Sequence, residues 1–335
     1  MLSNISQNAM HKVLVILVLV GVAITVQAQK AKPLIPTIDG PWWQIANNPD
    51  LGKYNGERQQ PVDFGIWRAD DGTWQLWSCI RGTKCPGQNT NRLLFGWEGK
   101  NLTDKNWSPT GIKWLADTTL GEINGGMQAP FVFKEDGVFY LFYGDWRRIC
   151  LAKSTDGKNF DRVLGGNGQP DLFTEHAYEP SPNNTARDPM VIKRGNTYYC
   201  YYTSHTTSYS QDGAAYARTS LDLRNWSESV TVSHTPPYPG NSPRFSDECP
   251  FVVYQKDVDL YYLFVTQIYG KNSQTTVYAS PNPLYFGFDD ERYKVCTLPV
   301  AAPELFEVDG QWYIASTMPD YSGIKLAKLK WKTPD

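Results

Sequence analysis

The chain has 335 residues, enough for one large domain or two ordinary ones, and a formal net charge of −2. This near-neutral charge gives no electrostatic basis for binding nucleic acid or an anionic membrane, so neither is expected as a partner. Aromatic residues make up 14% of the chain, with 12 tryptophans and 20 tyrosines. Most are expected in the core, but this content also suits a sugar-binding cleft, where aromatic rings stack on sugars.

The first 28 residues are typical of a secretory signal peptide. Lys12 supplies a positive charge, residues 13–26 are almost continuously apolar, and cleavage is expected after Ala28. The apolar run is short for a membrane span, and an uncleaved anchor is the alternative. No later stretch is apolar enough to cross a bilayer. The mature protein is therefore expected to be exported, periplasmic or secreted, with residues 29–56 as an N-terminal extension.

All six cysteines follow the expected signal peptide, in a part of the chain that would meet an oxidising compartment. Cys79 and Cys85 flank a short glycine-containing loop and are the best candidates for a disulfide. The other four lie in or beside strand-like runs and are interpreted as thiols. The sequence has no CxxC motif and no histidine cluster, so no metal site is predicted.

Five segments repeat one pattern: a small, acidic or thiol residue, then proline or phenylalanine, an apolar stretch, a polar turn and an aromatic strand. They begin at Asp63-Phe64, Ala129-Pro130, Asp188-Pro189, Cys249-Pro250 and Ala302-Pro303. Counted from Phe64 through the four prolines, the steps are 66, 59, 61 and 53 residues. Each segment is typical of a β-hairpin, because two apolar strands flank a turn rich in Asp, Gly and Asn.

A second marker follows three of these hairpins and combines an aspartate turn with an aromatic residue. The markers are 102–107, 154–160 and 220–226. Evenly spaced strands with one aromatic marker per unit indicate a β-propeller. We therefore predict an all-β, five-bladed propeller over residues 57–335, as a single domain. A β-sandwich with coincidental internal similarity is the alternative.

Three acids stand at the heads of these first strands: Asp63, Asp188 and Glu248. The first strand of each blade lines the central channel, so acids at matching points should converge at one end of it. Ala129 and Ala302 occupy the matching points of two other blades and leave room there. Converging carboxylates are the groups that glycoside hydrolysis requires. Asp247 is expected to point away, because neighbours on a strand alternate faces.

Arg187-Asp188-Pro189 and Glu248-Cys249-Pro250, with Asp63 in the first blade, resemble the catalytic pattern of glycoside hydrolase family 43. Families 32, 62, 68 and 117 are related, and the resemblance covers about residues 57–331. It implies that Asp63 is the general base, that Glu248 is the proton donor, and that Asp188 orients the substrate and raises the pKa of Glu248. It implies no required cofactor, with a structural calcium ion as a possibility.

The flanks of the acids depart from family 43, which usually has proline after the first aspartate and glycine between glutamate and proline. Phe64 and Cys249 stand there instead. Glu-Cys-Pro is closer to family 32, which implies a retaining fructosidase, but the opening phrase of that family is absent. A retaining fructosidase and a non-catalytic carbohydrate-binding propeller therefore remain alternatives to an inverting family-43-like enzyme.

Further substrate contacts are predicted near the expected funnel. The candidates are Arg187, Gln128, Trp146, Arg147 and Trp67. The expected protein is thus an exported glycoside hydrolase that cleaves O-glycosidic bonds of plant or algal oligosaccharides or polysaccharides. An inverting, exo-acting mode is expected. The sequence gives no indication of the oligomeric state.

Overall fold

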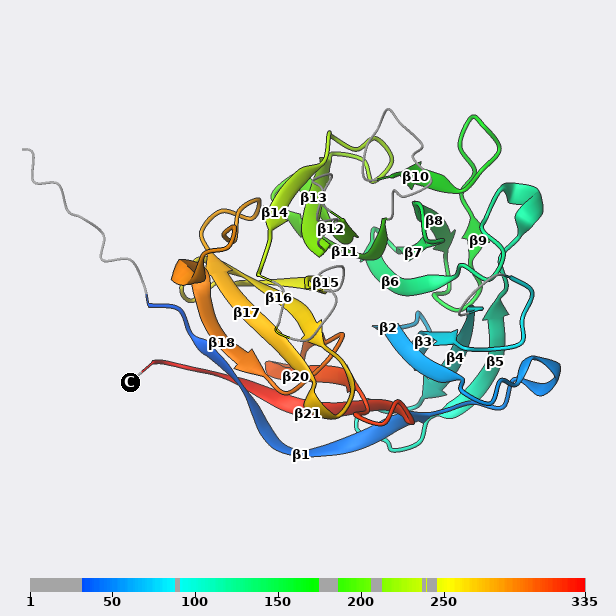
Figure 1. Cartoon of the computed structure of the whole chain (residues 1–335), viewed down its shortest axis with the longest axis horizontal. Coiled ribbons are helices and arrows are strands. Elements are labelled where there is room, and N and C mark those ends of the chain that lie inside the picture. The colour runs from blue at the N-terminus through cyan, green and yellow to red at the C-terminus, as the bar shows by residue number, and fades with distance from the viewer. Residues whose placement is uncertain are drawn as a thin grey trace, which may run out of the picture. The chain divides into compact units, whose positions relative to one another are not determined.

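A computed structural model describes residues 32–87, 91–174, 186–205, 213–236, 239 and 246–334. The expected signal peptide lies outside the described residues. The described chain forms five antiparallel sheets arranged as the blades of a propeller around a central channel (Figure 1). It contains strands and short 3-10 turns but no α-helix within these ranges, and no helix there is long and apolar enough to cross a bilayer.

Each blade runs from an inner strand at the channel to an outer strand at the rim. Blade 1 contains β2 (Gln60–Arg68), β3 (Trp74–Arg81), β4 (Leu93–Gly99) and β5 (Ser108–Trp114). Blade 2 contains β6 (Gln128–Glu135), β7 (Val138–Gly144), β8 (Ile149–Ser154) and β10 (Asp171–Phe173), with β9 (Asp161–Arg162) also paired to β8. Blade 3 contains β11 (Arg187–Arg194), β12 (Thr197–His205), β13 (Gly213–Ser220) and β14 (Val230–Ser233).

Blade 4 contains β15 (Glu248–Gln255), β16 (Leu260–Ile268), β17 (Gln274–Ser280) and β18 (Lys294–Leu298). Blade 5 contains β19 (Glu304–Val308), β20 (Gln311–Thr317), β21 (Gly323–Lys332) and β1 (Ile35–Asn47). The predicted five-bladed, all-β propeller is therefore confirmed. The β-sandwich alternative is wrong.

The ring closes through a strand that the sequence had placed outside the propeller. β1 pairs with β21 in antiparallel register from Ile35↔Lys332 to Asn47↔Gly323, so the two ends of the described chain share blade 5. Residues 35–47 therefore belong to the propeller, and the boundary expected at residue 57 is wrong. This pairing joins the ends of the ring by main-chain hydrogen bonds.

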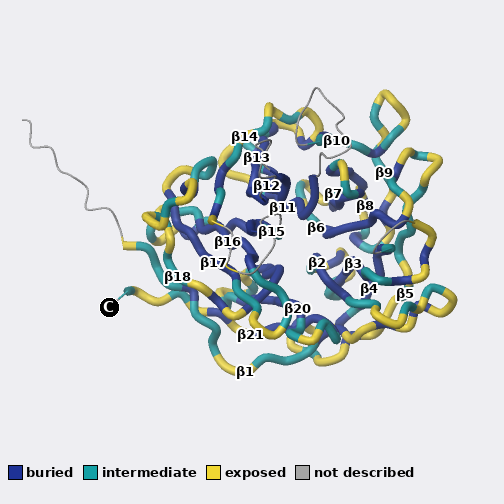
Figure 2. The backbone as a smooth tube through the Cα atoms, in the orientation of Figure 1, coloured by how far each residue is buried: buried dark blue, intermediate teal, exposed yellow. Residues whose placement is uncertain are grey.

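Neighbouring inner strands pack against one another around the channel, and the buried residues of each blade lie mainly in its second and third strands (Figure 2). The approach is close between blades 1 and 2. A Cβ on Gly65 of β2 would lie 2.4 Å from the carbonyl oxygen of Pro130 in β6, so only glycine fits at this point. Close packing of the inner strands fixes where their heads lie, and hence where the acids lie.

The aspartate-aromatic markers occur where the third strand of a blade passes to the fourth. In blade 2, Asp156 accepts hydrogen bonds from the backbone N–H groups of Lys158 and Asn159, and Phe160 packs between Trp67 and Trp77. The equivalent Trp107 of blade 1 is buried as well. These contacts confirm that the markers place an aspartate turn and a buried aromatic residue between the third and fourth strands, and in blade 2 that aromatic residue packs against blade 1.

The predicted disulfide is absent. All six cysteines are free, and Cys79 and Cys85 make separate contacts. The Cys79 thiol donates to the carbonyl of Met127 at 3.2 Å, whereas the Cys85 thiol donates to that of Arg92 at 3.4 Å. Cys79 lies inside β3 with its side chain in the core, so the two sulfur atoms do not meet across the loop.

Candidate active site

The head of every inner strand contains the same unusual backbone turn. Five non-glycine residues, one per blade, have positive φ: Asp63 at 33°, Ala129 at 34°, Asp188 at 57°, Cys249 at 49° and Ala302 at 47°. In blades 1 to 4 the strand pairing also shifts register there. Positive φ is uncommon in residues other than glycine, and such strain concentrates at functional sites. The five turns aim these positions at one end of the channel.

This repeat corrects the expected register of Glu248. The residue that matches Asp63 and Asp188 in blade 4 is Cys249, and Glu248 stands one position earlier. Glu248 therefore matches Arg187 of blade 3 and Gln128 of blade 2 instead. The acids still converge, but from two neighbouring positions of the repeat rather than from one.

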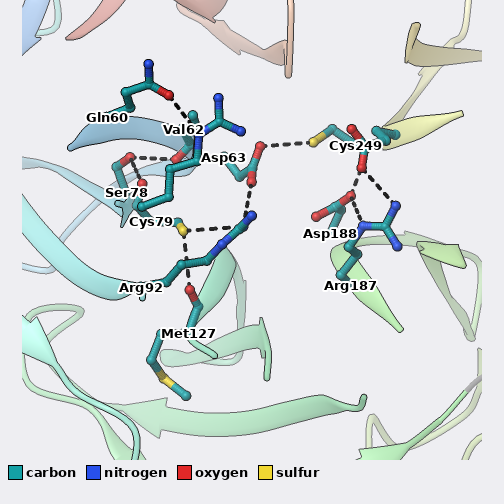
Figure 3. A network of polar contacts seen from close by, with 12 residues as sticks. Gln60, Val62, Asp63, Ser78, Cys79, Arg92, Met127, Arg187, Asp188 and Cys249 are labelled. Carbon is teal, nitrogen blue, oxygen red and sulfur yellow. Dashed lines mark hydrogen bonds and ion pairs between the residues drawn. The ribbon is translucent and has the colours of Figure 1, made fainter. Parts of the chain in front are cut away.

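Two residues, Arg187 and Cys249, connect the three acids, and the acids come from three different blades (Figure 3). The Cys249 thiol donates to Asp63 Oδ1 at 3.4 Å, and the Cys249 backbone N–H donates to Asp188 Oδ2 at 3.2 Å. Arg187 Nη2 donates to Glu248 Oε1 at 2.8 Å, and its Nε lies 3.7 Å from Asp188 Oδ2. The structure thus brings together the three predicted acids and the predicted Arg187.

The acids are largely removed from solvent. The side chains of Asp63, Asp188 and Glu248 are 12%, 5% and 15% exposed. Burial raises the pKa of Asp188 to about 7; Arg187 opposes this shift, whereas the charges of Asp63 and Glu248 reinforce it. The Asp188 carboxyl therefore keeps its proton up to about neutral pH. The Glu248 carboxylate is paired with the guanidinium of Arg187. The sequence had predicted the raised pKa for Glu248.

The structure places the other predicted substrate contacts in different surroundings, and one of them lies away from the funnel. Gln128 heads β6 and is 1% exposed, and neither atom of its amide has a hydrogen-bond partner among the described residues. Trp146 and Arg147 lie in the turn between β7 and β8, where Arg147 is exposed and the Trp146 ring lies 4.4 Å from the guanidinium of Arg92. Trp67 is not in the funnel: it is buried with Trp77, and its indole N–H donates to the carbonyl of Gly157.

Two residues of the site were missed by the sequence analysis. Arg92 precedes β4, and its Nη1 lies 3.8 Å from Asp63 Oδ2. Tyr269 follows β16, and its hydroxyl lies 3.1 Å from the sulfur of Cys249. The Cys249 thiol hydrogen points to Asp63, so the Tyr269 hydroxyl donates to the sulfur. Neither residue belongs to the repeated pattern, so no motif marked them.

Another buried carboxyl, that of Glu304, lies deeper in the channel. Glu304 of β19 accepts a hydrogen bond from the backbone N–H of Ile66 at 2.9 Å and shares a cavity of about 310 Å³ with Phe131, Met190 and Phe251. Burial raises the pKa of Glu304 well above its usual range. A neutral carboxyl among apolar side chains does not fit a calcium ion, which requires several oxygen ligands.

The fold is shared with solved glycosidase structures. One is described as a thermostable family-43 glycoside hydrolase, with 18% identity, a TM-score of 0.57, and coverage of 84% of this chain and 96% of its own. A family-43 enzyme from Xanthomonas citri in complex with xylose has 14% identity and a TM-score of 0.56, with 81% and 87% covered. A family-32 β-fructofuranosidase variant from Bombyx mori, in complex with sucrose, has 17% identity and a TM-score of 0.54, with 86% and 62% covered.

No protein-family model and no curated protein matches the sequence. At these identities the structural likeness demonstrates a common fold, the five-bladed propeller of family-43 and family-32 glycosidases. The fold expected from the resemblance in the sequence is therefore confirmed. Substrate and mechanism have to be argued from the residues of this chain.

Proposed function

We propose that the protein is a glycoside hydrolase that uses Asp63 as general base and Glu248 as proton donor. The observation that carries this proposal is the linked group of three carboxyls, from three blades, at one end of the propeller channel. A group of this kind can activate water on one side of a glycosidic bond and protonate the leaving oxygen on the other. An ordinary propeller scaffold has no need to bury three acids together.

Asp188 and Arg187 complete the proposed chemistry. Asp188 holds a proton near neutral pH, and Arg187 joins it to Glu248, so the free site stores a proton next to the donor. When a substrate hydroxyl engages Arg187 or Asp188, the Arg187–Glu248 pair is weakened and Glu248 can carry the proton for the leaving group. Gln128, Trp146 and Arg147 are the proposed sugar contacts, and the unpartnered amide of Gln128 supports this role.

The proposed substrates are oligosaccharides of plant or algal origin, cleaved with inversion and from a chain end. The family-43 neighbours from Xanthomonas citri are complexes with xylose and xylotriose, which favours a pentose or related unit. Export is part of the proposal and rests on the apolar segment 13–26 and the small residue at Ala28. Cys249 in place of glycine keeps retaining, fructosidase-like chemistry as the second candidate.

A single variant tests the proposed function. Glu248→Gln keeps the shape and the hydrogen-bond acceptor for Arg187 but cannot donate a proton to a leaving group. On oligosaccharide substrates we expect kcat/KM to fall by about 10²–10⁴-fold, with sugar affinity retained. Glu307→Gln, at an exposed position of blade 5, is the matched control. Equal turnover by the wild-type and Glu248→Gln proteins would refute the assignment, and NMR of the first anomer released distinguishes inversion from retention.

A further inference from the structure

Arg92 contacts the proposed base from outside the repeated pattern. Its Nη1 lies 3.8 Å from Asp63 Oδ2, and its side chain is 9% exposed. The main chain at Arg92 is anchored between blades, because its N–H donates to the carbonyl of Gly125 and the residue forms a parallel bridge with Gly126. Both ends of the side chain are thus fixed where blade 1 meets the segment that leads into blade 2.

The guanidinium of Arg92 is covered on its other sides. The Trp146 ring lies over it at 4.4 Å, and Nη1 also donates to the sulfur of Cys79 at 3.8 Å. Burial would lower the pKa of Arg92, but the neighbouring Cys79, Asp63 and Asp188 raise it, and the net direction is upward. A charged group enclosed in this way cannot reach a ligand without rearrangement. Its charge therefore acts on the neighbouring acids and not on a ligand.

The two oxygens of Asp63 have different partners. Oδ1 accepts from the neutral thiol of Cys249, and Oδ2 faces the cation of Arg92. The second cation of the site, Arg187, is engaged with Asp188 and Glu248. Among the described residues, Arg92 therefore supplies the ion pair made by Asp63. Without it, the negative charge of Glu248, joined by that of Asp188 once its proton is lost, would favour the protonated form of Asp63, which cannot act as a base.

We propose that Arg92, backed by Trp146, is a positioning residue for the reaction: it keeps Asp63 ionised and fixes the direction of its carboxylate toward the attacking water. This inference rests on the proposed function. It differs from the expected roles of the three acids, because Arg92 neither touches the substrate nor exchanges a proton. It acts through Asp63 alone, and that makes its effect visible in the pH dependence.

The test compares Arg92→Met with Arg92→Lys on an aryl glycoside whose leaving group needs no protonation, so that the acid limb of kcat/KM follows the base. Met removes the charge, and the acid limb should move upward by about 1–3 pH units. Lys keeps the charge, and the limb should stay close to that of the wild type. Arg68→Met, at an exposed position of the same blade, is the matched control. An unchanged limb in Arg92→Met would overturn the proposal.

A titration without turnover separates this inference from the proposed function. In protein labelled with ¹³C at the aspartate carboxyls, Asp63 is assigned by Asp63→Asn and should titrate at higher pH in Arg92→Met than in the wild type. If no glycoside is cleaved, the proposed function fails, and the titration still decides the role of Arg92. If Arg92→Met does not fold, Trp146→Ala loosens the guanidinium without removing it. Because Trp146 is also a proposed sugar contact, the readout in that variant is the Asp63 titration alone, and an unchanged titration would also overturn the proposal.

Discussion

The two parts of the central channel hold buried carboxyls under different conditions. At the head of the strands, three carboxyls lie with the guanidinium groups of Arg92 and Arg187. Deeper in the channel, Glu304 has a backbone N–H as its partner and apolar side chains around it. A buried carboxyl is tolerated either beside a cation or in the neutral form. The first condition keeps charge available for chemistry, and the second removes it.

The largest expected effect comes from breaking the charged group at Asp188. Asp188→Asn keeps the size of the side chain but removes its charge and its exchangeable proton. Proton transfer by a positioned group contributes about 10²–10⁴-fold, and we expect a loss of this order in kcat/KM on an oligosaccharide substrate. Asp161→Asn, exposed in blade 2, should change nothing. If the activity of Asp188→Asn stayed within about threefold of the wild type, a small change beside the expected loss, the proton on Asp188 would be irrelevant to the reaction.

Relative to the wild type, the same variant should gain stability as the pH rises. The folded-state pKa of Asp188 is raised from 3.8 to about 7, so the folded protein holds a proton that the unfolded chain releases above pH 3.8. Wild-type stability from this group is fully present below that pH and is lost by about 1.4 kcal/mol per unit as the pH approaches 7. Asn has no such loss. Denaturant unfolding between pH 4 and pH 7 should therefore favour Asp188→Asn increasingly, with Asp161→Asn parallel to the wild type.

Much of the fold and of the candidate site could be predicted from the sequence. The repeated heads from Asp63-Phe64 to Ala302-Pro303 identified the propeller, and the order of the acids placed them at one end of the channel. These features are local and recur in each blade, so one register carries through the whole chain. The offset of Glu248 was missed because it depends on a backbone turn with positive φ at Cys249, and the pattern of residue types does not reveal that turn.

The remaining errors involve contacts between distant segments. Arg92 reaches Asp63 from a loop outside the repeated pattern, and Trp67 turns into the core against Phe160 rather than toward the funnel. The pairing of β1 with β21 joins opposite ends of the chain. A sequence pattern records which face of a strand is apolar, but it does not record which neighbouring blade covers that face.

The neutral carboxyl deeper in the channel gives a smaller, purely structural effect. Glu304→Gln keeps an oxygen that can accept from the Ile66 N–H, whereas Glu304→Ala leaves that donor buried and unpaired, which costs about 1–3 kcal/mol. Because burial raises the pKa of Glu304, the wild type loses stability as the pH rises above the usual glutamate value, and the Gln variant does not. Chemical unfolding should thus rank Gln above the wild type at pH 8 and Ala below Gln at every pH. A wild type as stable as Gln across this range would show that Glu304 is ionised.

The smallest expected effect concerns the thiol that supports Asp63. Burial raises the pKa of Cys249 well above its usual range, so the group at 3.4 Å from Asp63 Oδ1 is a thiol donor and not a thiolate. Cys249→Ser supplies a hydroxyl that can donate to Asp63 and accept from Tyr269, and kcat/KM should change by no more than a few-fold, the equivalent of about 1 kcal/mol. Cys249→Val removes both contacts and should cost more. Cys296→Ser, in β18 of the same blade, is the matched control. Equal kcat/KM for the Ser and Val variants would mean that the thiol only fills space, and that Arg92 alone orients the base.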